Sequence, residues 1–314
     1  MAHDSMVVAG IDTGKMWLDI ACHPSGQALR VENDAGGHER LSAWLKDQDV
    51  GRVGLEASGG YERGVVAALR RAGFAVAVLQ PRQVRAFALF RLKLAKNDRL
   101  DAALIARCTA ELDGVRAAPD PRLEPLAEHL RLIEQLEGDL ARARTRAEAF
   151  HLPRHKRALQ REAERLARRV KAELLLLGKS VAAQDDLARR LTLIESVAGI
   201  GRRTALTLLI LMPELGHLSR GEAASLAGLA PFDRDSGRYR GQRRIQGGRH
   251  RVRRALYAAA LPASFRWNKA LVDVYKRLRA AGKNHKQALT ACARKLLTYA
   301  NAVLARQAEW TTAS

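Results

Sequence analysis

The chain has 314 residues, which is long enough for two domains and a sizeable core. Lys and Arg number 54 against 33 Asp and Glu, so the formal charge of +21 favours a polyanionic partner, with nucleic acid ahead of an anionic membrane surface. The sequence has no apolar run that would span a bilayer, no signal-peptide pattern at its start and no cysteine spacing typical of a metal site or disulfide framework, so we expect no membrane partner and a reducing, cytoplasmic location.

Residues 1–118 have the pattern of a mixed α/β domain. Apolar runs at 7–11 and 17–20 and a third stretch at 27–32 are separated by turn residues, which predicts three strands with tight connections. Beyond them we expect helices and strands in alternation: a helix at 37–47, a strand at 52–57, a helix at 61–71, a strand at 74–80 and two further helices from the eighties onward. A meander followed by such an alternation predicts a mixed sheet with helices on its faces.

A second region, residues 119–187, is expected to form long helices. It begins at a proline-rich boundary, and its leucines and isoleucines recur every three or four residues from Leu126 to Leu140. This spacing is typical of a coiled coil or an antiparallel helical hairpin, and Pro153 marks the expected bend between two helices. We interpret the region as a coiled-coil element that mediates dimerisation or spaces its neighbours. A solvated helical bundle without such a task is the alternative.

The third region, residues 188–314, is predicted to be mostly helical and has two signals for phosphate binding. At 196–209, SVAGIGRRTALTLL places a Gly-Ile-Gly turn between helical stretches, as in a helix-hairpin-helix element, and a plain helix–helix turn is the alternative. Between Arg234 and Arg254 there are nine arginines and one acid, and glycines at 237, 241, 247 and 248 would allow close backbone approach to a ligand. We predict nucleic-acid contacts by Arg202, Arg203, Arg238, Arg240, Arg243, Arg244, Arg249 and Arg251.

Four carboxylates are candidates for a metal site. Asp12 follows one predicted strand and Glu56 lies near the end of another, within apolar stretches where an unpaired carboxylate is costly. Asp98 and Asp101 are one turn apart at the start of a helix. If the four converged they would repel one another unless cations neutralised them, and two Mg²⁺ or Mn²⁺ ions roughly 3.5–4 Å apart are the usual solution in nucleases. Asp98 as a helix cap and Asp12 as a turn residue are the structural alternatives.

Taken in the order strand, strand, helix, the four acids resemble those of the RNase H-like fold of Holliday-junction resolvases. The motifs GIDTGKMWLD (10–19), LEASGGYE (55–62), VLQPRQVRAFA (78–88) and AKNDRLDA (95–102) resemble the N-terminal half of the DEDD-type transposases of bacterial insertion sequences, which are guided by a structured bridge RNA. The segment 228–260 is similar to the family's C-terminal half, so the likeness covers nearly the whole chain. Asn97 and Ser58 stand where the family commonly has threonine, and neither change removes a carboxylate.

The resemblance implies a fold, a reaction and a set of partners. The fold is an α/β N-terminal RNase H-like domain of the Holliday-junction-resolvase type, a helical coiled-coil middle and a mostly α C-terminal transposase domain. Asp12, Glu56, Asp98 and Asp101 would bind the metal ions, and Ser236, which otherwise lies in an ordinary Asp-Ser-Gly turn, would be the nucleophile. The partners would be DNA, a guide RNA and further copies of the chain in a homodimer or homotetramer, in a nucleoid-associated bacterial protein.

We therefore predict a DNA transposase of an insertion sequence that cuts and rejoins strands as a serine recombinase. Two other interpretations stay open. A structure-specific junction endonuclease would use the same metals with water, and not Ser236, as the nucleophile. A non-enzymatic nucleic-acid scaffold would use the carboxylates only as helix caps. Ser236→Ala separates the first two, and stabilisation by Mg²⁺ separates the third from both.

Overall fold

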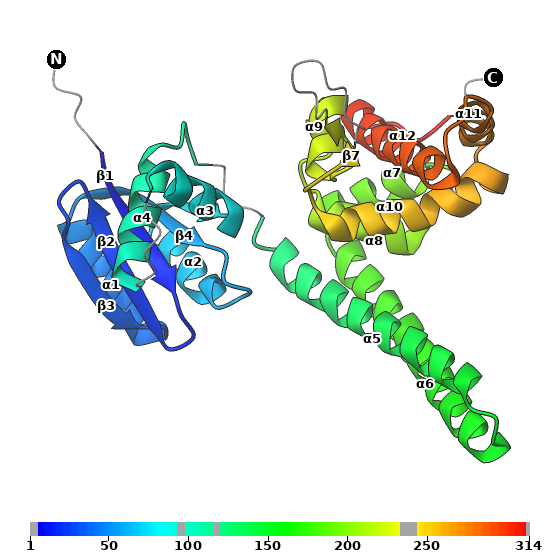
Figure 1. The fold of residues 1–314 in the computed structure, drawn as a ribbon, viewed down its shortest axis with the longest axis horizontal. Helices are drawn as coiled ribbons and strands as arrows, with labels where there is room; N and C mark the ends of the chain where they lie inside the picture. The colour runs from blue at the N-terminus through cyan, green and yellow to red at the C-terminus, as the bar shows by residue number, and fades with distance from the viewer. Residues whose placement is uncertain (1–5, 93–97, 116–119, 233–243, 312–314) are drawn as a thin grey trace. The chain divides into compact units, whose positions relative to one another are not determined.

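The computed structural model describes residues 6–92, 98–115, 120–232 and 244–311, and of residues 98–100 and 232 it describes the backbone alone. The chain forms two compact units, residues 1–118 and 119–314 (Figure 1).

The first unit is built on a five-stranded sheet with the order β3-β2-β1-β4-β5. Its strands are β1 (Val7–Thr13), β2 (Trp17–His23), β3 (Ala28–Glu32), β4 (Val50–Glu56) and β5 (Ala75–Leu79). The first three strands are antiparallel neighbours, whereas β4 and β5 run parallel to β1. The predicted meander followed by alternating elements is confirmed, because short turns can join only antiparallel strands and each parallel strand follows a helix.

Helices cover both faces of this sheet. The first pair is α1 (Ala35–Asp47) and α2 (Glu62–Arg71), whose apolar residues share a core with alternate residues of the strands, among them Ile11 and Leu55. The second pair is α3 (Pro81–Phe90) and α4 (Asp98–Ala110), which pack together with Leu79 of β5. The sheet is therefore buried on both sides.

Helix α4 lies directly on the backbone of the two central strands. A Cβ atom at Gly10 of β1 would come within 2.2 Å of the Ala102 carbonyl oxygen and the Ala106 nitrogen. A Cβ atom at Gly54 of β4 would come within 1.8 Å of the Thr109 hydroxyl oxygen. Glycine is needed at both positions because the helix and the strands are too close for any side chain between them.

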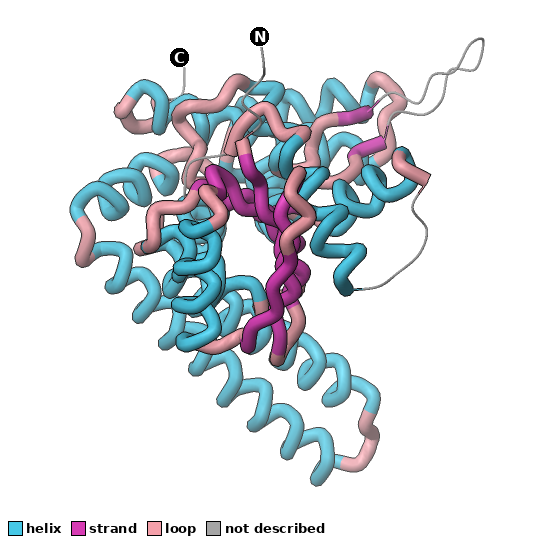
Figure 2. Tube along the Cα trace, turned by 90° about the vertical axis from the view of Figure 1, so that its left-hand side faces the viewer, coloured by secondary structure: helices cyan, strands magenta, loops and turns pink. Residues whose placement is uncertain are grey.

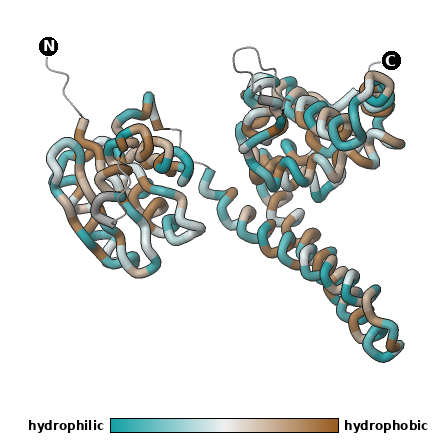
Figure 3. Tube along the Cα trace, viewed as in Figure 1, coloured by the Kyte–Doolittle hydropathy of each residue, from teal (hydrophilic) through white to brown (hydrophobic). Residues whose placement is uncertain are grey.

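The second unit begins with two long helices that run back along one another, α5 (Leu123–Ala149) and α6 (Pro153–Ala182). Figure 2 shows them side by side, and Figure 3 shows apolar and polar stretches alternating along both. Leu136 and Ala143 of α5 pack against Ala163 and Leu166 of α6. Within one chain the pattern thus forms the antiparallel hairpin, and Pro153 begins the second helix as predicted, at a position where a missing N–H costs nothing.

The rest of the second unit, where it is described, is built of helices and one short strand pair. Its elements are α7 (Asp185–Glu195), α8 (Arg202–Leu211), α9 (Arg220–Leu226), β6 (Pro231–Phe232), β7 (Arg244–Ile245), α10 (His250–Pro262), the π-helical turn η1 (Ala263–Trp267), α11 (Lys269–Ala280) and α12 (His285–Arg306). One core joins them to the base of the hairpin, since Leu130 and Leu177 pack with Leu206, Val252 and Leu296. The boundary expected at 187/188 is therefore not a division between compact units.

Two further features bear on the environment of the protein. All three cysteines are buried and free. Among the helices that the structure describes, none combines the length and the apolar character that crossing a bilayer requires.

Candidate active site

A row of charged residues crosses the sheet beneath α4. Asp12 in β1 lies opposite Asp19 in β2, and Asp19 lies opposite Arg30 in β3. On the other side of β1, Ile11 lies opposite Leu55 of β4, so the next residues in register are Asp12 and Glu56. The sequence-predicted acids Asp12 and Glu56 therefore stand at the same level, at the carboxyl ends of neighbouring parallel strands.

The face on which this row lies follows from the alternation of side chains along a strand. Gly10 faces α4, so Asp12, two residues later, belongs to the same face, and Glu56 is related to Gly54 in the same way. Asp101 precedes Ala102, the residue of α4 that lies against Gly10, and its side chain is half-buried. Asp98 is the first residue of α4, and its side chain lies outside the part that is described. The close contact of α4 with the sheet thus brings Asp101 and the start of the helix to the strand ends that carry Asp12 and Glu56.

Asp19 is an acid of this row that the sequence prediction missed. It is 7% exposed, and its carboxylate lies 3.6 Å from the Arg30 guanidinium. Two carboxylates directly opposite one another on adjacent strands are destabilising unless positive charge compensates them. Arg30 supplies such charge from β3 and also lies over the Trp17 ring at 5.4 Å from its centroid. The turn that joins β1 to β2 is the signal that could have found Asp19, because a tight turn fixes which residues pair across the hairpin.

The loops after β1 and β4 are tied together by one side chain. The Asn33 amide donates to the Gly14 carbonyl at 2.9 Å and to the Tyr61 carbonyl at 3.1 Å. Its own oxygen is 2.8 Å from Nε2 of His38, which therefore acts as the donor. Asp12 precedes the first of these loops and Glu56 precedes the second, so Asn33 fixes the spacing of the segments that leave the carboxylate row.

Glu62 shapes the loop that follows Glu56. Its carboxylate accepts hydrogen bonds from the Ser58 N–H at 3.1 Å, the Ser58 hydroxyl at 2.8 Å and the Gly60 N–H at 2.8 Å. Burial alone would raise the pKa of Glu62, but these hydrogen bonds to the ionised form outweigh it and hold the pKa below its ordinary value. The loop is therefore folded around a carboxylate that stays charged at neutral pH.

Among the residues whose side chains are described, no group of three or more His, Cys, Asp and Glu is arranged to hold a metal ion. Asp98 is not one of those residues, so the four-acid prediction concerns a set of which three members are described.

The predicted nucleophile, Ser236, lies outside the described residues. The two ends of the segment that contains it are described: β6 pairs with β7 in antiparallel register, with Pro231 opposite Ile245. Phe232 and Arg244, the described residues that flank the segment 233–243, are therefore paired with one another. Three of the predicted nucleic-acid contacts, Arg238, Arg240 and Arg243, fall in the same segment, whereas Arg244 is described and is exposed in β7.

The other predicted contact arginines have partners inside the chain. Arg203 donates to the Glu137 carboxylate at 2.8 and 2.9 Å, and Arg251 donates to Glu134 at 2.7 Å. These bonds connect α8 and α10 to α5. We therefore correct the sequence interpretation of Arg203 and Arg251, because a guanidinium already paired and largely buried fixes helices and is not available to phosphate.

Two more of these arginines have carboxylate partners near the same helices. Arg249 donates to Glu214 at 2.6 and 2.7 Å, so the same correction applies to it. Arg202 bonds Glu195 at 3.0 and 3.2 Å and remains half-exposed. The glycine interpretation also changes: a Cβ atom at Gly248 would lie 2.1 Å from the Gly228 nitrogen, so the close approach at Gly248 is to the chain's own backbone.

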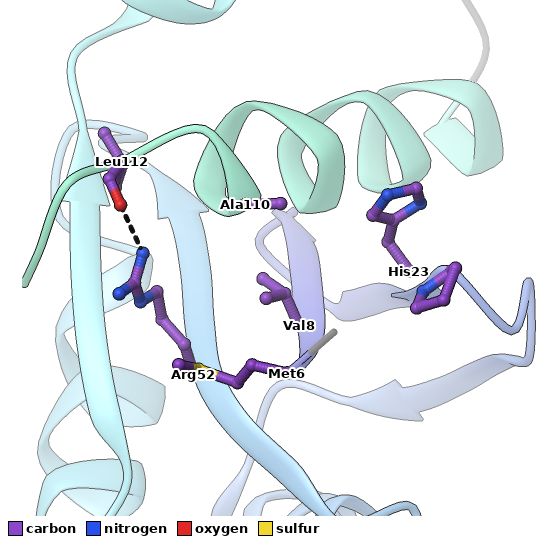
Figure 4. A pocket seen from close by; sticks show the side chains of 7 residues that line it. Met6, Val8, His23, Arg52, Ala110 and Leu112 are labelled. Carbon is purple, nitrogen blue, oxygen red and sulfur yellow. Dashed lines mark hydrogen bonds between the residues drawn. The ribbon is translucent and has the colours of Figure 1, made fainter. Parts of the chain in front are cut away.

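A cavity of about 280 Å³ lies at the other end of β1 (Figure 4). Its lining consists of Met6, Val8, His23, Pro24, Arg52, Ala110 and Leu112. Arg52 donates to the Leu112 carbonyl at 2.7 Å and thereby ties β4 to the end of α4. Because Val8 and Asp12 are at opposite ends of β1, this cavity is separate from the carboxylate row.

Comparison with known proteins matches both halves of the chain to transposases. A family model described as "Transposase", of the DEDD type, matches residues 9–155, and one described as "Transposase IS116/IS110/IS902 family" matches residues 191–276. The pilin gene-inverting proteins of Moraxella lacunata and Moraxella bovis are each 27% identical over 315 residues, which is 96% of this chain and 96% of theirs. A 43.6 kDa protein of insertion element IS110 from Streptomyces coelicolor is 36% identical over 116 residues, 35% of this chain and 27% of its own length.

Among solved structures, Thermus thermophilus RuvC in complex with a Holliday junction substrate is 20% identical, with a TM-score of 0.26 over 33% of this chain and 92% of RuvC. The two family models together span well over half of the chain. The chain belongs to the IS110/IS116 family of DNA transposases, enzymes that cut and rejoin DNA strands.

Proposed function

We propose that this transposase cuts and rejoins DNA with two Mg²⁺ or Mn²⁺ ions held by Asp12, Glu56, Asp98 and Asp101, and with Ser236 as the nucleophile. The observation that carries the proposal is the common level of Asp12 and Glu56 on adjacent parallel strands, under the helix that contains both other aspartates. The mixed sheet, in the order β3-β2-β1-β4-β5, places both strands at its centre and supports a site at their carboxyl ends.

The chemistry of the acids fits a pair of hard divalent cations. All four are oxygen donors, the class that Mg²⁺ and Mn²⁺ prefer over softer metals. Asp12, Glu56 and the buried Asp19 lie at one level of the sheet, where their negative charges would repel one another unless positive charge compensates them, as Arg30 does for Asp19. The ions would supply polarisation of the phosphate oxygens and charge neutralisation in the transition state.

In the proposed reaction the Ser236 oxygen attacks a DNA phosphorus atom. The bond from phosphorus to one bridging oxygen breaks, the departing strand leaves with a hydroxyl group, and the other strand stays attached to the serine as a phosphodiester. The serine proton passes to a base, for which Glu56 and the aspartates are the candidates. Attack by a DNA hydroxyl on this link then rejoins strands and releases the serine, so the energy of the bond is conserved.

The decisive experiment traps protein on junction DNA in the presence of Mg²⁺ and looks for a covalent adduct. We expect an adduct with the unaltered chain, none with Ser236→Ala and none with Asp12→Asn. Ser225→Ala is the matched control, because Ser225 is an exposed serine of α9 in the same unit, and it should form the adduct normally. Cleavage by Ser236→Ala without an adduct would establish the junction endonuclease that uses water instead.

A second measurement addresses the metal directly. Mg²⁺ should raise the melting temperature of the unaltered chain, because a ligand that binds only the folded state stabilises it. Asp12→Asn should lose most of that rise. No rise in the unaltered chain would argue that the acids act only as caps, as in a nucleic-acid scaffold, and an equal rise in both proteins would show that the stabilising ions bind away from Asp12.

The partners beyond DNA are also proposals. The formal charge of +21 supports a contact with a further polyanion, which the family resemblance suggests is a guide RNA. The helix-hairpin-helix interpretation of 196–209 rests on the N-terminus of α8, where the N-cap residue Gly201 provides no side-chain cap. It no longer rests on Arg203, which is paired with Glu137. Assembly into a homodimer or homotetramer, in which Ser236 of one copy meets the acids of another, is tested by solution mass and by mixing Ser236→Ala with Asp12→Asn, which should restore the adduct.

A further inference from the structure

The segment 263–286, formed by η1, α11 and the start of α12, exposes aromatic rings beside positive charge. Phe265 is 53% exposed and Trp267 is 62% exposed. The Phe265 and Tyr275 rings are in tilted contact with centroids 4.9 Å apart, and the Tyr275 hydroxyl lies 2.7 Å from Nδ1 of His285. We call this segment the aromatic-basic face.

The rings of this face are held in place from below. Asn268 is 1% exposed, donates to the Ala198 carbonyl at 2.9 Å and caps α11 by accepting from the Leu271 N–H at 3.2 Å. Because the residue next to Trp267 is anchored twice, Trp267 is directed outward by a rigid backbone. A π-helical turn is rare and occurs often at functional sites, and η1 is the turn that presents both exposed rings.

The cations of the face are available to an external partner. Its sequence contains seven lysines and arginines and a single acid, Asp273. The seven are Arg266, Lys269, Lys276, Arg277, Arg279, Lys283 and Lys286, all exposed. None of them makes an ion pair with a carboxylate in the part of the chain that the structure describes, in contrast to Arg203, Arg249 and Arg251. Arg266 instead lies 5.4 Å from the centroid of the Trp267 ring.

Exposed aromatic rings within a field of lysines and arginines match one chemistry closely. Unpaired bases stack on such rings while their phosphates meet the cations, whereas in a duplex the stack of base pairs covers the base faces. A protein partner fits less well, because lysine is depleted from protein interfaces. We propose that the aromatic-basic face binds an unpaired DNA strand, with Trp267 as the main stacking residue. The inference rests on the DNA chemistry of the family and not on Ser236 or the metal set.

The test measures the binding of the full chain to a labelled oligothymidylate, to a duplex of the same length and to an oligouridylate. Trp267→Ala should weaken binding to the oligothymidylate between about 5-fold and 100-fold, which is the range for the loss of stacking on one ring. Duplex binding should change far less. Trp267→Phe should restore most of the affinity, because it keeps an aromatic face. Leu176→Ala, at an exposed apolar residue of α6, is the control and should bind normally.

Three outcomes of these measurements would overturn the proposal. Equal oligothymidylate affinity in Trp267→Ala and the unaltered chain would remove the face from DNA binding. A Trp267 effect on the oligouridylate alone would assign it to RNA, and a lowered oligomeric mass in Trp267→Ala would assign it to contact between copies. Quenching of tryptophan fluorescence by oligothymidylate, lost in Trp267→Phe, gives a readout that does not depend on the stability of the alanine variant. The oligothymidylate assay measures binding without cleavage, so its result is separable from that of the adduct assay, which depends on Ser236 and the acids.

Discussion

At the scale of single residues, Asn33 joins the two loops that leave the carboxylate row. We expect Asn33→Ala to lower the free energy of unfolding by about 1–2 kcal/mol, because two carbonyl hydrogen bonds are lost. Strand cleavage should fall by more than this modest loss explains, since the loops after Asp12 and Glu56 would no longer be held together. Urea denaturation and a cleavage assay measure the two effects. The matched control is Gln27→Ala, which removes an exposed side-chain amide from the neighbouring turn and should leave both unchanged.

His38 gives the first unit a dependence on pH. Burial lowers the pKa of His38, with a smaller opposing effect from Asp34, so folding favours the neutral ring. The unfolded chain then binds the proton more readily, and this contribution to stability is present above the unfolded pKa of about 6.5 and is lost as the pH falls toward the lower folded value. Urea denaturation near pH 7.5 and near pH 5.5 should therefore show a smaller loss of stability in His38→Gln than in the unaltered chain. An identical loss would contradict this account.

The residue scale also shows what a sequence can and cannot locate. The positions of Asp12 and Glu56 at strand ends are predictable, because each lies at the end of an apolar run that marks a strand. Asp19 is found only by pairing residues across the turn between β1 and β2, which goes beyond the pattern of its own strand. The arginine prediction counts charge but does not detect partners: Glu137 is 66 residues from Arg203 in sequence, and Glu134 is 117 residues from Arg251.

At the scale of elements, the contact of α4 with Gly10 sets the position of half of the proposed metal site. Gly10→Ala would place a Cβ atom 2.2 Å from the backbone of α4, so the helix must move. We expect the free energy of unfolding to fall by at least about 2 kcal/mol and the stabilisation by Mg²⁺ to be lost. Gly114→Ala is the control, because a Cβ atom there meets nothing within 4 Å. Equal Mg²⁺ stabilisation in Gly10→Ala would separate α4 from metal binding.

The helical hairpin is fixed to its unit through Glu134. This side chain is 11% exposed and faces Arg251 at 2.7 Å and Arg203 at 3.5 Å. Glu134→Ala leaves the largely buried Arg251 without its carboxylate partner, whereas Arg203 keeps Glu137, so we expect a loss of about 2–4 kcal/mol in thermal or urea unfolding of the second unit. Glu128→Ala, on an exposed position of the same helix, should change stability by less than about 0.5 kcal/mol. A similar change in both variants would mean that the network does not hold the hairpin.

Element order was largely predictable because hydrophobic periodicity decides it locally. The limits are equally physical. The short pair β6–β7 has two residues in each strand, too few for any periodicity, and η1 differs from an α-helix only in its hydrogen bonding. The periodicity of the hairpin predicts its helices but not whether each helix packs against the same chain or another copy. Leu136 is buried within the chain, so Leu136→Asp would unfold the hairpin and would not report on oligomerisation. Exposed Phe150 and Leu152 at the turn are better positions for that test.

At the scale of the whole molecule, net charge governs the response to salt. With a formal charge of +21, binding to DNA should displace counterions from several phosphates. For about six to ten phosphate contacts, affinity should fall by about 10³–10⁵ between roughly 50 and 200 mM salt. Fluorescence anisotropy across a salt series measures the slope. A flat response would contradict a binding mode based on phosphate.

The anchoring of the hairpin at Glu134 has a geometric consequence. Glu137, which pairs with Arg203, lies one turn further along α5, and from there the helix continues to Ala149, so at about 1.5 Å per residue the turn projects about 18 Å past this ion pair. A molecule that binds the turn is held at that distance from the ion pairs, so the hairpin acts as a spacer of fixed length. Lengthening both helices by one heptad would extend the reach by about 10 Å without altering any contacting surface, so relatives that differ only in helix length would hold their bound molecules at different separations.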